Sequence, residues 1–499
     1  MKAAVRKSRK DGIKTVFSRN GYYGRRVAAC RVVWLWSAVL ALLCTLISYP
    51  GIWYSDSYVR VATGGAVLNA IVKTLTGHRA PLYTGNAFTV TPSLFMGLSI
   101  GVTGHVALYT FCQAFAFFAA TFLLIREMNP GSRKLQSVLF ACCPLIYGMS
   151  VYYEAGIGCV TGLSALILLL RRAGDEKTRG DRVIEFLLVM LSSYVMIGYR
   201  TNALTVLPVL GFYLLRMKPG RERVFALLLS VVLGVGMTVG IPRIFDIHSE
   251  STASAGIVWE MLTVIQRMKP EDREKYQDFL DEIGGEGSTR IALKQSDEGT
   301  AGSFMWGEAM GTGKMSAPGA TMTAVKKYIQ LMTERPREWW SVKWDVIMRS
   351  LGIQGQLDYS EYNYNRWDQM QEYGMVDSLQ RRAFYDSFMG TCGACSALTL
   401  HPWVSFLLTF VFVCAAYILK NPLRSLYSLT AWTAVFYYLA YLLDTPAYDF
   451  RYFYPSLYLM LILDAAILME WLRKAVLKLR SSGRKEGKAF ADAGDHPGI

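Results

Sequence analysis

Hydrophobic residues gather along this chain in long runs that are separated by polar segments. A helix needs about 20 residues to cross a hydrocarbon core about 30 Å thick, and several of these runs approach or reach that length. We therefore predict an all-α, polytopic membrane helix bundle with about ten spans. The predicted spans are 32–47, 105–125, 135–153, 156–170, 183–198, 203–215, 224–241, 403–419, 426–443 and 453–471. The shortest, 203–215, is expected to be a broken or re-entrant half of the span before it.

Two polar regions between the predicted spans are too long to be simple connectors. The first is 49–104, and within it the segment 55–75 has apolar residues near helical spacing. This spacing predicts an amphipathic helix along the outer membrane surface. The segment that follows, 85–104, is apolar but interrupted by Gly, Thr and Pro. Such a composition favours a partly embedded segment that packs against protein.

The second region, 242–401, is the size of a small domain and shows no strand pattern of any strength. We expect it to be mostly helical, with breaks at Pro270 and Pro336, because proline suits the first turn of a helix and not its interior. Its Gly- and Ser-rich middle, 284–320, predicts a flexible loop or lid. The remaining parts are a basic N-terminus at 1–31, a membrane bundle at 32–241, further spans within 402–472 and a basic tail at 473–499.

The composition supports a membrane protein, because 52% of the residues are hydrophobic and only 18% are charged, whereas soluble domains carry about 25% charged residues. The net charge of +15 would also fit a nucleic-acid-binding protein, but Lys and Arg gather in both termini and in every second loop between the predicted spans. Basic loops of this kind stay cytoplasmic. We therefore expect the lipid bilayer as a partner, no nucleic acid, and both termini in the cytoplasm.

Two short motifs in the outer region are weak. The stretch GEAMGTGKM at 307–315 lacks the spacing and the final Ser or Thr of a phosphate-binding loop. Cys392 and Cys395 form a Cys-x-x-Cys pair without the neighbouring βαβ unit of a thioredoxin-like site. A local disulfide or two incidental thiols are the favoured interpretations of this pair.

Charged and polar residues recur at the outer ends of the predicted spans, where ionisable groups are costly unless they are paired or functional. They are Asp56 after the first span, Glu154 between the third and fourth, Arg200 and Asn202 after the fifth, and Asp449 and Arg451 before the last. Short outer loops hold such groups close to the bundle, so we predict one outward cavity for an anionic, sugar-containing ligand whose phosphate binds arginine. The alternative is that Arg200 and Arg451 reach lipid phosphates and Asp449 merely pairs with Arg451.

The order of these features resembles the GT-C superfamily of integral membrane glycosyltransferases. In that superfamily a large outward loop with a catalytic Asp follows the first span, and a second acid lies between the third and fourth spans. The stretches YPG and SDS within 49–57, RTN at 200–202 and FRYFYP at 450–455 also resemble a poorly characterised bacterial branch with this layout. The resemblance covers most of 30–470 and implies transfer of a sugar from a polyprenyl-phosphate donor.

The resemblance implies a role for each candidate residue. Asp56 would be the base that deprotonates or positions an acceptor hydroxyl, and Glu154 the second acid that holds the acceptor or a divalent cation such as Mg or Mn. Arg200 and Arg451 would bind the donor phosphate. The substrate pocket would be completed by Tyr58, His78, Asn202, Asp449 and Tyr452. The outer loop YYEAG offers one carboxylate where metal-using members carry an Asp-x-Asp or Glu-x-Asp pair, so any metal bound by Asp56 and Glu154 stays an open question.

We therefore expect an inverting sugar transfer on the outer face of a bacterial cytoplasmic membrane, to a glycan, lipid or protein acceptor of the cell envelope. Two other classes stay open. A transporter or flippase for a lipid-linked sugar would need polar residues through the depth of the bundle. A non-enzymatic membrane scaffold would leave the bundle inert and place its interactions in 242–401.

Overall fold

The structure is a computed structural model that describes residues 30–49, 55–84, 89–130, 132–150, 153–217, 220–250, 254–296, 301–305, 307, 310–355, 379–396, 401–443 and 448–494. In this part of the chain the fold is all-α apart from two strands of two residues each. Six helices are long and apolar enough to cross a membrane, which indicates a multi-pass membrane protein. They are α6 (Ala107–Met128), α8 (Glu154–Arg171), α9 (Arg179–Tyr199), α11 (Arg221–Ile244), α23 (Arg424–Leu443) and the first thirty residues of α24 (Phe450–Gly494).

The other four predicted spans are helical but shorter. They are α3 (Arg31–Ile47), α7 (Arg133–Gly148), α10 (Leu207–Met217) and α22 (Pro402–Ile418). The helix predicted at 203–215 is indeed broken, because a 3₁₀ turn, η1 (Thr201–Val206), separates α9 from α10. That these four helices cross the membrane stays a prediction.

The region 49–104 contains the helix predicted at 55–75 as α4 (Ser55–Leu75), followed by α5 (Val90–Thr103). Two glycines bring the backbones of these helices into contact. A Cβ added to Gly97 would lie 2.2 Å from the Gly64 carbonyl oxygen, and one added to Gly64 would lie 2.9 Å from the Gly97 nitrogen. Because α5 also packs against α6 and α9, this close crossing sets the position of α4 against the bundle.

The second outer region is mostly helical, as predicted. Its helices are α12 (Ala255–Gln266), α13 (Pro270–Arg273), η2 (Glu274–Tyr276), α14 (Asp281–Gly284), α15 (Ser288–Gln295), α16 (Gly302–Met305), α17 (Thr312–Met315), α18 (Ala320–Glu334), α19 (Pro336–Ser350) and α21 (Leu379–Ser396). The breaks at Pro270 and Pro336 are confirmed, and each proline begins a helix. The prediction of a loop was wrong for Ser288–Gln295, which is helical. Part of 284–320 lies outside the described residues, so the lid stays a prediction.

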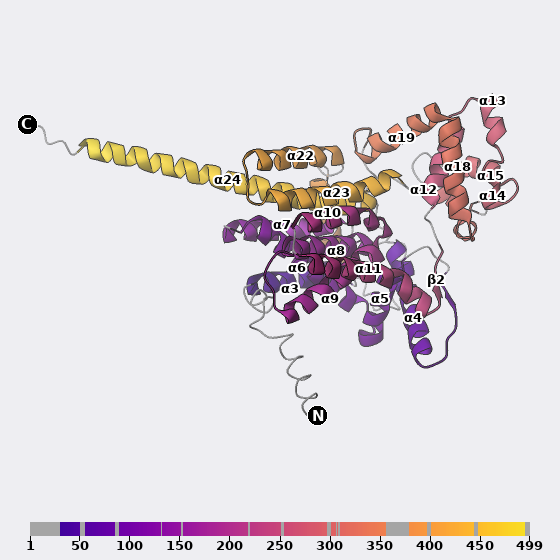
Figure 1. The fold of residues 1–499 in the computed structure, drawn as a ribbon, viewed down its shortest axis with the longest axis horizontal. Helices are drawn as coiled ribbons and strands as arrows, with labels where there is room; N and C mark the ends of the chain where they lie inside the picture. The colour runs from indigo at the N-terminus through magenta and orange to yellow at the C-terminus, as the bar shows by residue number, and fades with distance from the viewer. Residues whose placement is uncertain are drawn as a thin grey trace, which may run out of the picture.

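The region 242–401 is tied to the membrane bundle by Lys343, which is also part of a buried ion pair. Lys343 of α19 donates hydrogen bonds to the Glu260 carboxylate of α12 and to the Leu442 carbonyl near the end of α23, each at 2.6 Å. A second tie is the parallel pairing of β1 (Leu82–Tyr83) with β2 (Ile247–His248). Figure 1 shows α12–α19 at one end of the bundle, while the basic C-terminal part of α24 projects from the opposite end.

Replacing Gly97 by alanine tests the crossing of α4 and α5. The added methyl group would overlap the Gly64 backbone, and overpacking of this kind costs about 1–3 kcal/mol. We expect Gly97→Ala to lower the apparent melting temperature of the purified protein in detergent. Gly65→Ala is the matched control, because a Cβ at Gly65 meets nothing within 4 Å. Equal melting temperatures for the two variants would contradict the close crossing.

Candidate functional site

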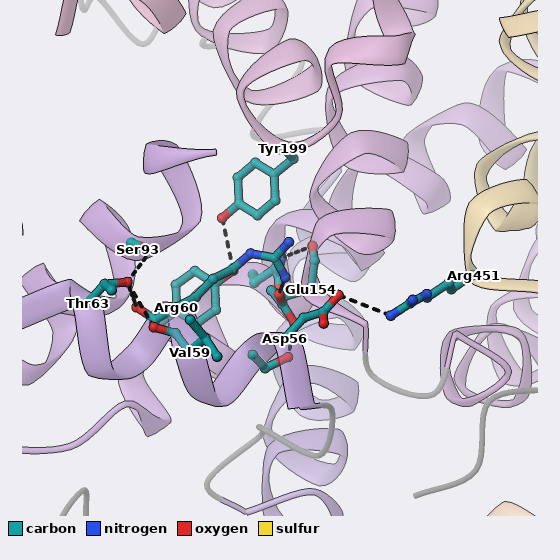
Figure 2. A network of polar contacts seen from close by, with 11 residues as sticks. Asp56, Val59, Arg60, Thr63, Ser93, Glu154, Tyr199 and Arg451 are labelled. Carbon is teal, nitrogen blue, oxygen red and sulfur yellow. Dashed lines mark hydrogen bonds and ion pairs between the residues drawn. The ribbon is translucent and has the colours of Figure 1, made fainter. Parts of the chain in front are cut away.

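Polar residues predicted from separate loops lie close together, and Figure 2 shows three of them, Asp56, Glu154 and Arg451. Asp56 lies in the first turn of α4, and Glu154 is the first residue of α8. Arg200 follows the last residue of α9 in an extended conformation, which directs the chain into η1. Asp449 and Arg451 lie at the start of α24. Five positions from four outer segments are thus brought into one cluster.

Glu154 is buried and held by two residues of α4. Arg60 donates to its Oε1 atom and Ser57 to its Oε2 atom, and Arg60 and Glu154 are only 4% and 2% exposed. Burial disfavours the charged form of Arg60, but Glu154, Tyr153 and Asp56 together outweigh burial and raise the pKa of Arg60. The Glu154 carbonyl also accepts a hydrogen bond from Gln113 of α6 at 2.7 Å. Glu154 therefore joins α4, α6 and α8.

Asp56 belongs to a second, more exposed pair. Its Oδ2 atom accepts a hydrogen bond from Arg451 Nη1 at 3.0 Å. Arg451 Nε also lies 2.8 Å from Asp449 Oδ2, while Asp449 Oδ1 accepts the backbone N–H of Arg451 at 2.9 Å and so caps α24. The pairing of Asp449 with Arg451, which the alternative interpretation expected, is thus present. The same arginine also contacts Asp56.

Arg200 lies between two tyrosine rings. Its guanidinium carbon is 4.7 Å from the ring centre of Tyr153 and 5.1 Å from that of Tyr452, which is cation–π geometry. The Nε and Nη2 atoms are buried and have no hydrogen-bond partner. Among the described residues no carboxylate forms an ion pair with Arg200. Since buried charges are costly unless paired, this guanidinium is suited to an anionic ligand.

A largely apolar cavity of about 460 Å³ lies among α5, α6, α8 and α9. Its lining includes Phe95, Ala165 and Val195, with Tyr109, Gln113 and Tyr199 among the polar exceptions. The hydroxyl groups of Tyr109 and Tyr199 lie 3.0 Å apart, and Gln113 donates to the backbone of Glu154. The cavity therefore borders residues that contact the charged cluster.

One predicted pocket residue, His78, is not brought to the charged groups. His78 lies beyond the far end of α4, and at 1.5 Å per residue the helix carries it about 30 Å away from Asp56. It is exposed, so the suggestion that it completes the pocket is incorrect. Tyr58 packs against the apolar core. Asn202 hydrogen-bonds within η1, where its side chain accepts from Thr201.

Sequence reasoning missed Ser57, Arg60 and Tyr153. Arg60 and Ser57 are one helical turn apart, and both lie within the predicted helix 55–75, so they share one face. An arginine in a helix predicted to lie beside the bundle at the membrane surface was the signal that was available. Tyr153 precedes Glu154 and contacts three arginines, because its ring lies 5.6 Å from the guanidinium carbons of Arg60 and Arg451 as well as beside Arg200.

The residues present do not fit the divalent cation that the resemblance raised. In the described part of the chain, no group of three or more His, Cys, Asp or Glu side chains is placed to hold a metal ion. Each oxygen of Glu154 already accepts a hydrogen bond, and one oxygen of Asp56 accepts a hydrogen bond from Arg451.

Comparisons with protein-family models, with curated proteins and with solved structures find no match for this chain.

Replacing Glu154 tests whether it has a structural role. Glu154→Gln leaves Arg60 charged and buried beside a neutral amide, and breaking a buried pair costs about 3–5 kcal/mol. We expect a clear fall in the apparent melting temperature, partly reversed by adding Arg60→Gln. Glu271→Gln on exposed Glu271 is the control. A melting temperature for Glu154→Gln equal to that of the control would show that the pair does not stabilise the fold.

Proposed function

We propose that this protein is a membrane glycosyltransferase of GT-C type. It would move a sugar from a polyprenyl-phosphate donor to a cell-envelope acceptor on the outer face of a bacterial cytoplasmic membrane. About ten spans with both termini in the cytoplasm form part of this proposal, since basic loops stay on that side. The charged cluster would then face outward.

The observation that carries the proposal is the unpaired guanidinium of Arg200. Arg60 and Arg451 both have carboxylate partners, whereas Arg200 has two buried nitrogen atoms without a partner. A phosphate would satisfy these donors through charge-assisted hydrogen bonds. Tyr153 and Tyr452, which enclose the guanidinium, would then lie beside the sugar.

The reaction that suits this arrangement is a displacement at the anomeric carbon. The acceptor oxygen forms a bond to that carbon and gives its proton to Asp56, while the bond from the carbon to the phosphate oxygen breaks. The electron pair leaves with the lipid phosphate, whose growing charge is stabilised by arginine. Asp56 is the base in this scheme because it is the more exposed of the two predicted acids, with a side chain 22% exposed against 3% for Glu154.

The apolar cavity supports a lipid-linked donor. At about 30 Å³ for each water-sized group, its volume accommodates on the order of fifteen such groups. It ends beside Tyr109 and Tyr199, and Tyr199 directly precedes Arg200 in the chain. A prenyl chain in this cavity would therefore have its phosphate near the anion site.

A transporter is supported less well by the bundle. Asp464 of α24 is buried within a predicted span and accepts a hydrogen bond from Thr409 of α22 at 2.9 Å. One such group does not make a polar path through the bundle, which transport of a sugar needs. A scaffold role gives no reason for a buried arginine whose Nε and Nη2 atoms have no hydrogen-bond partner.

Asp56→Asn tests the base. Loss of general base catalysis reduces rates by about 10²- to 10⁴-fold, so transfer of labelled sugar from prenyl-phosphate donors by the purified protein should fall by that factor. Asp278→Asn, which changes an exposed aspartate of the outer region, should transfer at the wild-type rate. Equal transfer by Asp56→Asn and wild type would remove Asp56 from the mechanism.

Arg200→Met tests the anion site. A hydrogen bond to a charged group contributes about 1.5–3 kcal/mol, so prenyl-phosphate binding should weaken by roughly 10- to 100-fold. Because no ion pair is broken in the free protein, the apparent melting temperature without ligand should stay equal or rise. Arg200→Lys keeps the charge but loses the planar stacking, and should recover binding only in part. Unchanged binding by Arg200→Met would place the phosphate elsewhere.

A further inference from the structure

Arg451 holds the group on which the proposed chemistry depends. Its Nη1 atom donates to Asp56 Oδ2 at 3.0 Å, and its Nε atom lies 2.8 Å from Asp449 Oδ2 (Figure 2). A guanidinium in this position occupies one of the two carboxylate oxygens that an acceptor hydroxyl would approach. While this contact persists, that oxygen is not available to the acceptor.

The same arginine borders the anion site. The guanidinium carbon of Arg451 lies 4.9 Å from the ring centre of Tyr452, and that of Arg200 lies 5.1 Å from the same centre. Both guanidinium groups also contact the ring of Tyr153. The guanidinium carbons of Arg451 and Arg200 are therefore no farther apart than their two distances to the Tyr452 ring centre added together. Arg451 is the more available second arginine for a phosphate seated against Arg200, because Arg60 is buried in its pair with Glu154.

We propose that Arg451 is an anion-operated latch that holds Asp56 until a donor phosphate binds. This inference rests on the proposed function. The phosphate attracts the Nη1 side of Arg451 because arginine binds phosphate through two parallel hydrogen bonds. Asp449, which holds the Nε side, keeps the guanidinium within the site. The released Asp56 carboxylate then accepts the acceptor proton, so Arg451 is a positioning residue that makes base activation depend on the donor.

The latch predicts opposite effects of Asp56→Asn on binding and on transfer. The variant removes the carboxylate that competes for Arg451, so the full-length protein in lipid nanodiscs should bind farnesyl phosphate about five- to tenfold more tightly than wild type while transfer is lost. This gain should be smaller in the Arg451→Gln background, where no guanidinium remains to be released. If Asp56 merely repelled the phosphate, the affinity gain from Asp56→Asn would be larger in the Arg451→Gln background than in the wild-type background. In the Arg451→Gln background Asp56 has lost its arginine partner, so its charge repels phosphate more strongly. Farnesol, which has no charge, should bind all variants equally.

Infrared difference spectra of the wild-type protein give a second measurement that does not require Arg451→Gln to fold. The carboxylate band of Asp56, identified by its loss in Asp56→Asn, should shift when farnesyl phosphate is added. An unshifted band, or an equal or larger affinity gain in the Arg451→Gln background, overturns the latch and leaves the sugar transfer intact. Failure of farnesyl phosphate to bind both wild type and Asp56→Asn overturns the latch and the proposed function together.

Discussion

The buried pair of Arg60 and Glu154 is the interaction on which the arrangement of the cluster depends. Neither group is accessible enough to be stabilised by water, so each needs the other at hydrogen-bond distance. The pair fixes α4 against the start of α8, and Asp56 lies one helical turn before Arg60. Any shift of α4 that moved Asp56 would also separate two buried charges. The position of the exposed carboxylate is thereby set by a pair that takes no part in the proposed chemistry.

The cluster contains three arginines and three carboxylates, and their pairing is uneven. Among the described residues, Glu154 forms an ion pair with Arg60, Asp56 and Asp449 form ion pairs with Arg451, and no carboxylate forms one with Arg200. The formal charges of the three arginines and the three carboxylates therefore balance, but the end of the cluster at Arg200 stays positive. Tyrosine rings around Arg200 supply the negative faces that stabilise a cation without neutralising it. An anion can bind there without displacing a carboxylate from Arg200.

The hydrophobic pattern predicted the helices well, because crossing a membrane imposes a length and a composition on each one. The prediction of α4 gave its observed bounds, and the outer-end residues Asp56, Arg200 and Arg451 did converge. The contact of Gly64 with Gly97 could not be predicted, since a glycine signals close packing without naming its partner. His78 was assigned to the pocket from the resemblance, although α4 itself separates it from Asp56.

Glu154 shows that position in the chain predicts which residues lie close together better than it predicts what each residue does. Its place at the outer end of α8 was foreseen, but the partners that set its chemistry, Arg60 and Ser57, come from a helix almost a hundred residues earlier. A carboxylate at a helix N-terminus is favoured by the helix dipole whether or not it reacts. The two acids differ in their surroundings. Glu154 accepts hydrogen bonds on both carboxylate oxygens, whereas Asp56 contacts Arg451, which also borders Arg200. Arrangements of this kind depend on tertiary contacts, and a single sequence does not encode them locally.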